Sequence, residues 1–257
     1  MKYSVSSLTM SASLRVAFQI YVDNFVTFAV IVGIVWLPAT LLSAFLGALL
    51  GKFVVAGVAL SYEFFVALAM SIAISLPLLG SFVLQRVATD VAVAQACLGQ
   101  KPTLAGAYQG ALPRILDIVL VSLMTGFLIM CGAIAFIVPG IVLALRYAYA
   151  LPIVLVEKVG PVTAMQRSTM LTEGRKGNLF WQLVVVSILT GIVVKFLGNA
   201  IAGSQVTYAS QLLRSLPEVL LGPVIPIVVM LDYLGARTAK EGFGLEQLGA
   251  STGAPLA

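Results

Sequence analysis

Residues 25–46 read FVTFAVIVGIVWLPATLLSAFL and contain no charged side chain. The hydrocarbon core of a bilayer is about 30 Å thick, and a helix needs about 20 consecutive apolar residues to cross it. The stretch therefore predicts a transmembrane helix, and this helix decides the class of fold.

The composition of the whole chain agrees with a membrane solvent. The chain has 257 residues, of which 60% are hydrophobic and 10% are charged, and its mean hydropathy is +1.07. Globular domains carry roughly 25% charged residues, so a soluble fold of this size would leave too much apolar surface in water. We therefore expect a single all-α integral membrane domain over residues 1–257.

Six stretches meet the length rule for a membrane-spanning helix. They are Phe25–Leu46, Phe64–Leu84, Ile115–Val138, Gly140–Val156, Leu179–Gly198 and Glu218–Leu234. Consecutive stretches would pair as three hairpins. The polar residues 204–215 are expected to form the loop between the last two spans.

The fourth stretch is the weakest of the six. It is short, it carries Arg146, and only Pro139 and Gly140 separate it from the third span. It is either a full span in a tight hairpin or a re-entrant segment over residues 140–156. We favour the full span because residues 151–156 continue the apolar run as far as Glu157.

The basic residues predict the orientation, because Lys and Arg are enriched in cytoplasmic loops. With the N-terminus inside, Lys52, Lys195 and Arg214 face the outer side. All other basic residues except the intramembrane Arg146 are then cytoplasmic: Lys2, Arg15, Arg86, Lys101, Arg114, Lys158, Arg167, Arg175, Lys176, Arg237 and Lys240. Both termini should therefore face the cytoplasm.

A unit of one amphipathic stretch followed by two apolar spans occurs three times. The amphipathic stretches begin near Ser11, Pro102 and Pro161, and the units cover residues 7–98, 101–158 and 161–237, with a tail at 238–257. Apolar residues at spacings of three and four are typical of helices that lie on a membrane surface. On the first stretch, the predicted apolar face consists of Met10, Leu14, Ala17, Phe18 and Tyr21.

The second span of each unit contains a proline, namely Pro77, Pro152 or Pro226. A proline inside a span frees a backbone carbonyl and kinks the helix. The pattern predicts three parallel hairpins around a common centre. Ser43, Gly47 and Gly51 form a ladder of small residues, which suits close helix packing within the chain or a homo-oligomer face.

The residue types present exclude most familiar chemistry. The chain has no histidine and two cysteines, Cys97 and Cys131, which the topology keeps apart. Histidine-dependent nucleophile systems and zinc motifs are therefore excluded, and no phosphate-cradling glycine motif occurs. The basic residues stand singly, which argues against nucleic acid. We expect a non-enzymatic protein with no catalytic residue, no metal and no cofactor.

Intramembrane ionisable residues are the remaining functional candidates, because each is costly in lipid. Arg146 is expected to face the bundle centre beside Tyr147 and Tyr149, as a structural anchor or as a ligand-binding group. Asp117 is excluded as its partner, because it lies roughly 24 Å deeper along the hairpin at 1.5 Å per residue.

A second group of charges lies near the cytoplasmic ends of the spans. Asp117, Glu157 and Asp232 are at a depth similar to that of Arg86, Arg114 and Arg237. They form either a ring of ion pairs between hairpins or a polar vestibule for a small ion or a lipid headgroup. Arg146, Asp117 and Asp232 are therefore the candidate ligand-binding residues.

Several segments together carry a family resemblance. They are residues 14–18 (LRVAF) with Asn24 and Phe25, 137–141 (IVPGI) with 145–147 (LRY), Arg167 and Ser168 with Leu171 and Thr172, and Arg237 with 240–243 (KEGF), Leu245 and Glu246. In these the chain resembles the bacterial glycerophosphoryl diester phosphodiesterase membrane-domain family and its stand-alone uncharacterised relatives. The resemblance implies a six-helix protein of the bacterial cytoplasmic (inner) membrane. In some relatives this region is fused to a soluble phosphodiesterase domain, which we do not expect here.

Two functions are compatible with these patterns. The first is a membrane protein that interacts with lipids or an envelope partner through its amphipathic helices, whose flanking Arg and Lys suit anionic headgroups. The alternative is a transporter or channel for a small molecule or ion, with a polar path near Arg146.

Overall fold

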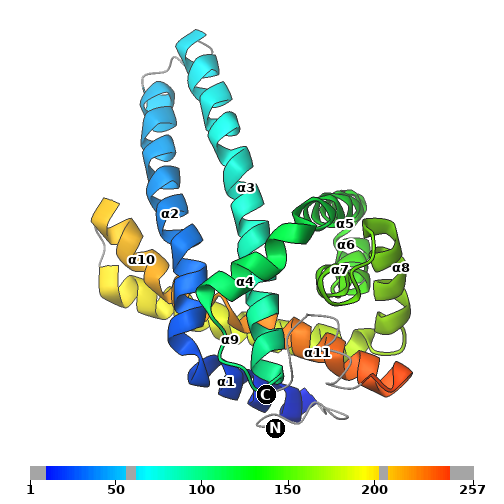
Figure 1. Cartoon of the computed structure of the whole chain (residues 1–257). Helices are drawn as coiled ribbons and strands as arrows, with labels where there is room; N and C mark the ends of the chain where they lie inside the picture. Colours follow the sequence, from blue (N-terminus) through cyan, green and yellow to red (C-terminus); the bar gives the residue numbers. More distant parts are fainter. Residues whose placement is uncertain (1–9, 56–61, 203–207, 244–257) are drawn as a thin grey trace.

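The computed structural model describes residues 10–55, 62–202 and 208–243. All the regular structure in these ranges is helical (Figure 1). The all-α expectation is confirmed for this part of the chain.

The first three helices form a long hairpin with a short helix at its base. α1 spans Met10–Asp23, α2 spans Phe25–Val55 and α3 spans Tyr62–Cys97. Figure 1 shows α2 and α3 side by side, rising away from the rest of the molecule. The predicted spans at residues 25–46 and 64–84 lie inside these helices, and α3 continues through Pro77 as helix.

The middle of the chain forms a compact group of shorter helices. α4 spans Leu104–Ala111 and begins at Thr103, whose hydroxyl accepts a hydrogen bond of 3.2 Å from the Gly106 amide, as helix N-caps do. A 3₁₀ turn, Leu112–Arg114, leads into α5 (Ile115–Ala135), which is followed by α6 (Ile137–Arg146) and α7 (Ala150–Glu157).

The α5–α6 hairpin turns at Phe136, where the backbone is extended (φ −160°, ψ 149°). The prediction that Pro139 and Gly140 form the turn is wrong. Pro139 lies in the first turn of α6, where its missing N–H costs no intrahelical bond. Gly140 packs instead against α5, because a Cβ atom on it would lie 2.8 Å from the Cα of Ala133.

The last part of the chain contains α8 (Pro161–Thr172), α9 (Lys176–Ala202), α10 (Tyr208–Leu221) and α11 (Val224–Glu241). The expectation of a loop over residues 204–215 is corrected, because the described part, from Tyr208 onward, is helical. α10 packs against α2 and α9. The predicted last span is interrupted at Gly222 and Pro223, between α10 and α11.

Two of the three span prolines begin helices rather than kinking them. Pro152 is the third residue of α7, and Pro226 is the third residue of α11. A proline in the first turn needs no N–H partner. The prediction of mid-span kinks is therefore wrong at these two positions, since each chain break lies just before the proline.

Within the described residues, five helical segments are long and apolar enough to cross a membrane. They are Phe25–Ala48, Leu104–Ala135, Ile137–Glu157, Lys176–Ile201 and Leu212–Glu241. The remaining predicted span, Phe64–Leu84, lies in α3 and is not among these five segments. Six crossings in three hairpins therefore stay a prediction, as does the threefold repeat.

The burial of these segments differs sharply. In the last one, Leu212–Glu241, 72% of the most apolar window is buried inside the protein, against 11% for the segments that contain α5 and α9. α11 contacts α1, α3, α8 and α9, so it forms the centre of the packed region. α5 and α9 expose large apolar side chains such as Phe127 and Phe196, which is typical of surfaces that face lipid.

Helices occupy all three predicted amphipathic stretches. α1 buries Ala17, Ile20 and Tyr21, but Phe18 from its predicted apolar face is 66% exposed. α4 buries Ala107 and Ala111. Their position at a membrane surface remains a prediction.

Candidate functional site

The site begins at the break between α6 and α7. Residues 147–149 turn instead of continuing the helix, so the Arg146 carbonyl and the Tyr149 N–H lose their usual i→i−4 partners. The hydroxyl of Ser168 on α8 replaces both partners. It donates a hydrogen bond of 2.8 Å to the Arg146 carbonyl and accepts one of 3.2 Å from the Tyr149 amide. Ser168 is completely buried, so its hydroxyl satisfies two groups that water cannot reach.

This break aims Tyr149 into the centre of the protein. Its phenol donates a short hydrogen bond to Oδ2 of Asp232 on α11. Arg175, just before α9, donates to the other carboxylate oxygen at 3.2 Å. The Asp232 side chain is 6% exposed, so its charge is compensated inside the protein by a guanidinium and a phenol. The three residues join α7, α11 and the start of α9.

A second cluster is centred on Glu157, which is about two helical turns along the chain from Tyr149. Arg167 of α8 forms a two-pronged hydrogen bond with its carboxylate, at 2.7 and 3.1 Å. The Tyr233 hydroxyl donates to the same carboxylate at 3.2 Å, and Arg237 Nε lies 3.6 Å from it. Glu241 accepts from both arginines, at 3.0 Å from Arg167 and 3.1 Å from Arg237.

In the second cluster, the contact with Glu157 favours the charged form of Arg167. Hydrogen bonding to Glu157 raises the pKa of Arg167, which lies outside the membrane-spanning segments. Arg237 also stacks over the Phe243 ring at 3.7 Å from its centroid. Two-pronged Arg–carboxylate pairs have defined geometry, so this cluster holds α7, α8 and α11 in one arrangement.

Arg146 does not face the bundle centre, and that prediction is wrong. Its side chain is exposed, and its Nε donates a 3.0 Å hydrogen bond to the Thr169 hydroxyl on α8. Tyr149 takes the central position instead and is completely buried. The reason is the helix break, which turns the chain between the two residues.

Asp117 lies apart from Asp232. It pairs with Arg114 at 3.0 Å, three residues away on the chain, and both side chains are partly exposed. The structure therefore does not bring Arg146, Asp117 and Asp232 into one site. Ion pairs do form at the span ends, but Asp232 pairs with Arg175.

Several residues of these clusters were not recognised from the sequence. Arg175 carries no distinguishing motif, and Arg167 and Glu241 were part of the family resemblance only. Asp90 gave a clear signal, because it stands alone among apolar residues in VATDVAV at positions 87–93. An isolated acidic residue in an apolar run indicates either a member of an ion pair or a functional group.

Asp90 on α3 is completely buried, six residues beyond the predicted span end at Leu84. Arg86 Nε lies 3.8 Å from its carboxylate, and neither carboxylate oxygen has a hydrogen-bond partner among the described residues. Burial raises the pKa of Asp90 to about 6, against the opposing effect of Arg86.

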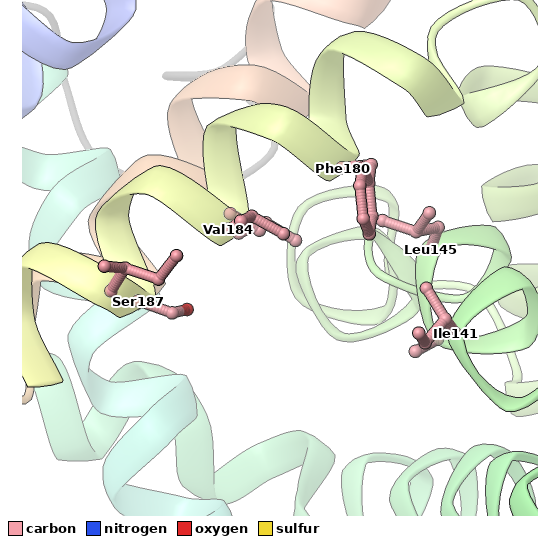
Figure 2. A pocket seen from close by; sticks show the side chains of 8 residues that line it. Ile141, Leu145, Phe180, Val184 and Ser187 are labelled. Carbon is pink, nitrogen blue, oxygen red and sulfur yellow. The ribbon is translucent and has the colours of Figure 1, made fainter. Parts of the chain in front are cut away.

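An open apolar groove runs between α6 and α9 (Figure 2). Its volume is about 370 Å³, which falls within the roughly 300–1,000 Å³ of ligand sites. Figure 2 shows Phe180 beside Leu145 at one end and Ser187 at the other. The groove suits an apolar chain, because nearly all of its lining is hydrocarbon: Ile141, Ala144, Leu145, Phe180, Leu183 and Val184.

Metal ligands do not gather in the parts of the chain that the structure describes, where no three His, Cys, Asp or Glu residues form a group that could hold an ion. Cys97 is free and buried, and Cys131 is free and exposed.

No protein-family model, curated protein or solved structure matches this chain.

Proposed function

We propose that this chain is a non-enzymatic, multi-pass protein of the bacterial cytoplasmic membrane that binds membrane lipids in envelope homeostasis. In this proposal the chain crosses six times with both termini in the cytoplasm. The helices α1, α4 and α8 lie at the cytoplasmic face, where they meet anionic headgroups. An envelope partner protein is a further ligand that the same surface would accept.

One observation carries the proposal. A basic residue accompanies each short helix: Arg15 lies within α1, Lys101 precedes α4, and Lys158 precedes α8. All three are exposed, and in the described structure none of them pairs with a carboxylate. Each juxtamembrane cation contributes about 1 kcal/mol to attraction by an anionic leaflet. The three together would favour anionic over zwitterionic lipid.

The test is native mass spectrometry of protein extracted in mild detergent, with phosphatidylglycerol or phosphatidylcholine added. The wild-type protein should retain more phosphatidylglycerol. The triple variant Arg15→Gln, Lys101→Gln, Lys158→Gln should lose much of that excess. Lys195→Gln is the matched control, because this exposed lysine on α9 is predicted to lie on the outer side. Equal retention of both lipids by the wild-type protein would reject the proposal.

Genetic and topological experiments test the remaining parts. Reporter fusions should place both tails in the cytoplasm. A deletion strain should show altered lipid composition or a weakened barrier under envelope stress. Unchanged composition and barrier would argue against a role in the envelope.

A transporter or channel is the second candidate, favoured by the buried ionisable network of Tyr149, Asp232 and Arg175 among apolar helices. Ionisable groups inside spans often mark ion paths. If the protein is a transporter or channel, Asp232→Asn should abolish the flux of the transported ion or small molecule in reconstituted vesicles, while Asp117→Asn should not. Absence of flux in wild-type vesicles would remove the candidate.

A further inference from the structure

Arg146 differs from the other arginines near the packed centre of the protein. Five of these pair with carboxylates: Arg86 with Asp90, Arg114 with Asp117, Arg167 with Glu157 and Glu241, Arg175 with Asp232, and Arg237 with Glu157 and Glu241. Arg146 meets only the neutral hydroxyl of Thr169 within the described residues. Ionisable residues in apolar segments pair with one another or with backbone carbonyls, or face water, and no carboxylate of the described residues pairs with Arg146.

Arg146, whose guanidinium has no carboxylate partner among the described residues, is next in the chain to a residue that lines the α6–α9 groove. Leu145 lines the groove together with Phe180, and Arg146 is next in the chain. Lys176 precedes Phe180 by four residues, which is about one turn of α9. The Lys176 side chain makes no hydrogen bond or ion pair in the part of the chain that the structure describes. Two cations that have no carboxylate partner among the described residues are therefore close in the chain to Leu145 and Phe180, which line the same groove.

The first turn of α9 strengthens the preference for an anion at this end. α9 is a 27-residue helix that begins at Lys176. The N-terminus of a helix presents free N–H groups and a partial positive charge, which favour phosphate. The cations Arg146 and Lys176 point to the same kind of ligand, because guanidinium and ammonium groups both bind phosphate.

We propose that the α6–α9 groove binds one anionic phospholipid, with an acyl chain between the two helices and its phosphodiester on Arg146 and Lys176. The inference rests on the proposed lipid-binding function and adds a specific site to it. The apolar lining excludes a free soluble anion as the natural occupant, because such a ligand would leave the groove empty.

The experiment is native mass spectrometry with stepwise removal of lipid from the full-length protein. Wild-type protein given palmitoyl-oleoyl phosphatidylglycerol should keep one lipid under conditions that strip the others. Arg146→Gln and Lys176→Gln should each weaken this binding about tenfold, since a hydrogen bond to a charged group is lost. Ala144→Phe should weaken it by filling the groove. Excess inorganic phosphate should not displace the lipid.

The triple variant Arg15→Gln, Lys101→Gln, Lys158→Gln is the matched control, since it changes exposed cations that neither line the groove nor follow a lining residue in the chain. It should lose loosely held lipid and keep the resistant one. If Arg146→Gln and Lys176→Gln also keep the resistant lipid, the groove site is rejected while the proposed function stands. If phosphatidylcholine is retained as well as phosphatidylglycerol by every protein, both proposals fail. Displacement by inorganic phosphate would show a simple anion site and overturn the acyl-chain assignment.

Discussion

The Ser168 hydroxyl donates a 2.8 Å hydrogen bond to the backbone carbonyl of Arg146, across the break between α6 and α7. The same oxygen accepts the Tyr149 N–H at 3.2 Å. One buried side chain on α8 thereby stabilises a turn in another helix pair, and this turn sends Arg146 and Tyr149 to opposite environments.

Ser168→Ala should destabilise the protein by about 1–3 kcal/mol, because it leaves the buried Tyr149 N–H without a partner and the Arg146 carbonyl with only the 3.5 Å hydrogen bond from the Thr172 hydroxyl. Thermal unfolding in detergent measures the change. Ser122→Ala is the control, since the Ser122 hydroxyl only adds a bond to Ile118 in its own helix. A loss no larger than that of the control would show that the turn does not depend on Ser168.

Asp232→Asn should cost about 3–5 kcal/mol of stability, because removing one partner of a buried pair leaves Arg175 uncompensated. Asp117→Asn should cost less than about 1 kcal/mol, since its pair with Arg114 is partly exposed. Both variants are compared by unfolding in the same detergent. Similar losses in the two variants would contradict the buried network.

The pH dependence of stability should reveal Asp90. Burial raises its pKa from 3.8 to about 6, so the folded protein holds the proton more tightly than the unfolded chain. Stability should therefore fall as the pH rises from about 4 to about 6, by on the order of 2 kcal/mol. Asp90→Asn should flatten the unfolding profile over this range, whereas Asp117→Asn should leave the fall in place. A flat wild-type profile would exclude this titration.

Gly140→Val should destabilise the α5–α6 hairpin by about 1–3 kcal/mol, because the backbone of Ala133 occupies the space a side chain needs. Gly126→Val is the matched control on α5, since no atom lies within 4 Å of a Cβ built there. Unfolding of the two variants in detergent gives the comparison. Equal stability of the two variants would show that the close approach of Gly140 to Ala133 contributes little to the free energy of unfolding.

The small-residue pattern shows where sequence reasoning stops. Ser43, Gly47 and Gly51 have the spacing of a helix-packing ladder, yet nothing approaches within 4 Å of a Cβ built on Gly47. The close helix contact occurs at Gly132 and Gly140, which share no such spacing on one helix. A ladder predicts that a face can pack closely, but the partner and the place depend on the tertiary fold.

The charged residues also show that the direction and the partner of a side chain depend on the tertiary fold. Arg146 was singled out correctly as unusual, because one charge in an apolar run is visible in any window of sequence. The predicted direction of its side chain was wrong, because the three-residue break between α6 and α7 places Tyr149 in the core instead of Arg146. Arg175 could not be identified as the partner of Asp232, because 57 residues separate them along the chain.

The amino-acid sequence by itself determined the helical class, the apolar segments and the positions of the three short helices α1, α4 and α8, because these depend on local composition and periodicity. Only the tertiary structure decided that α11 is the centre, that Ser168 supports the turn at Tyr149, and that no carboxylate of the described residues pairs with Arg146. These relationships join residues distant in the chain, and their geometry arises only when the helices pack.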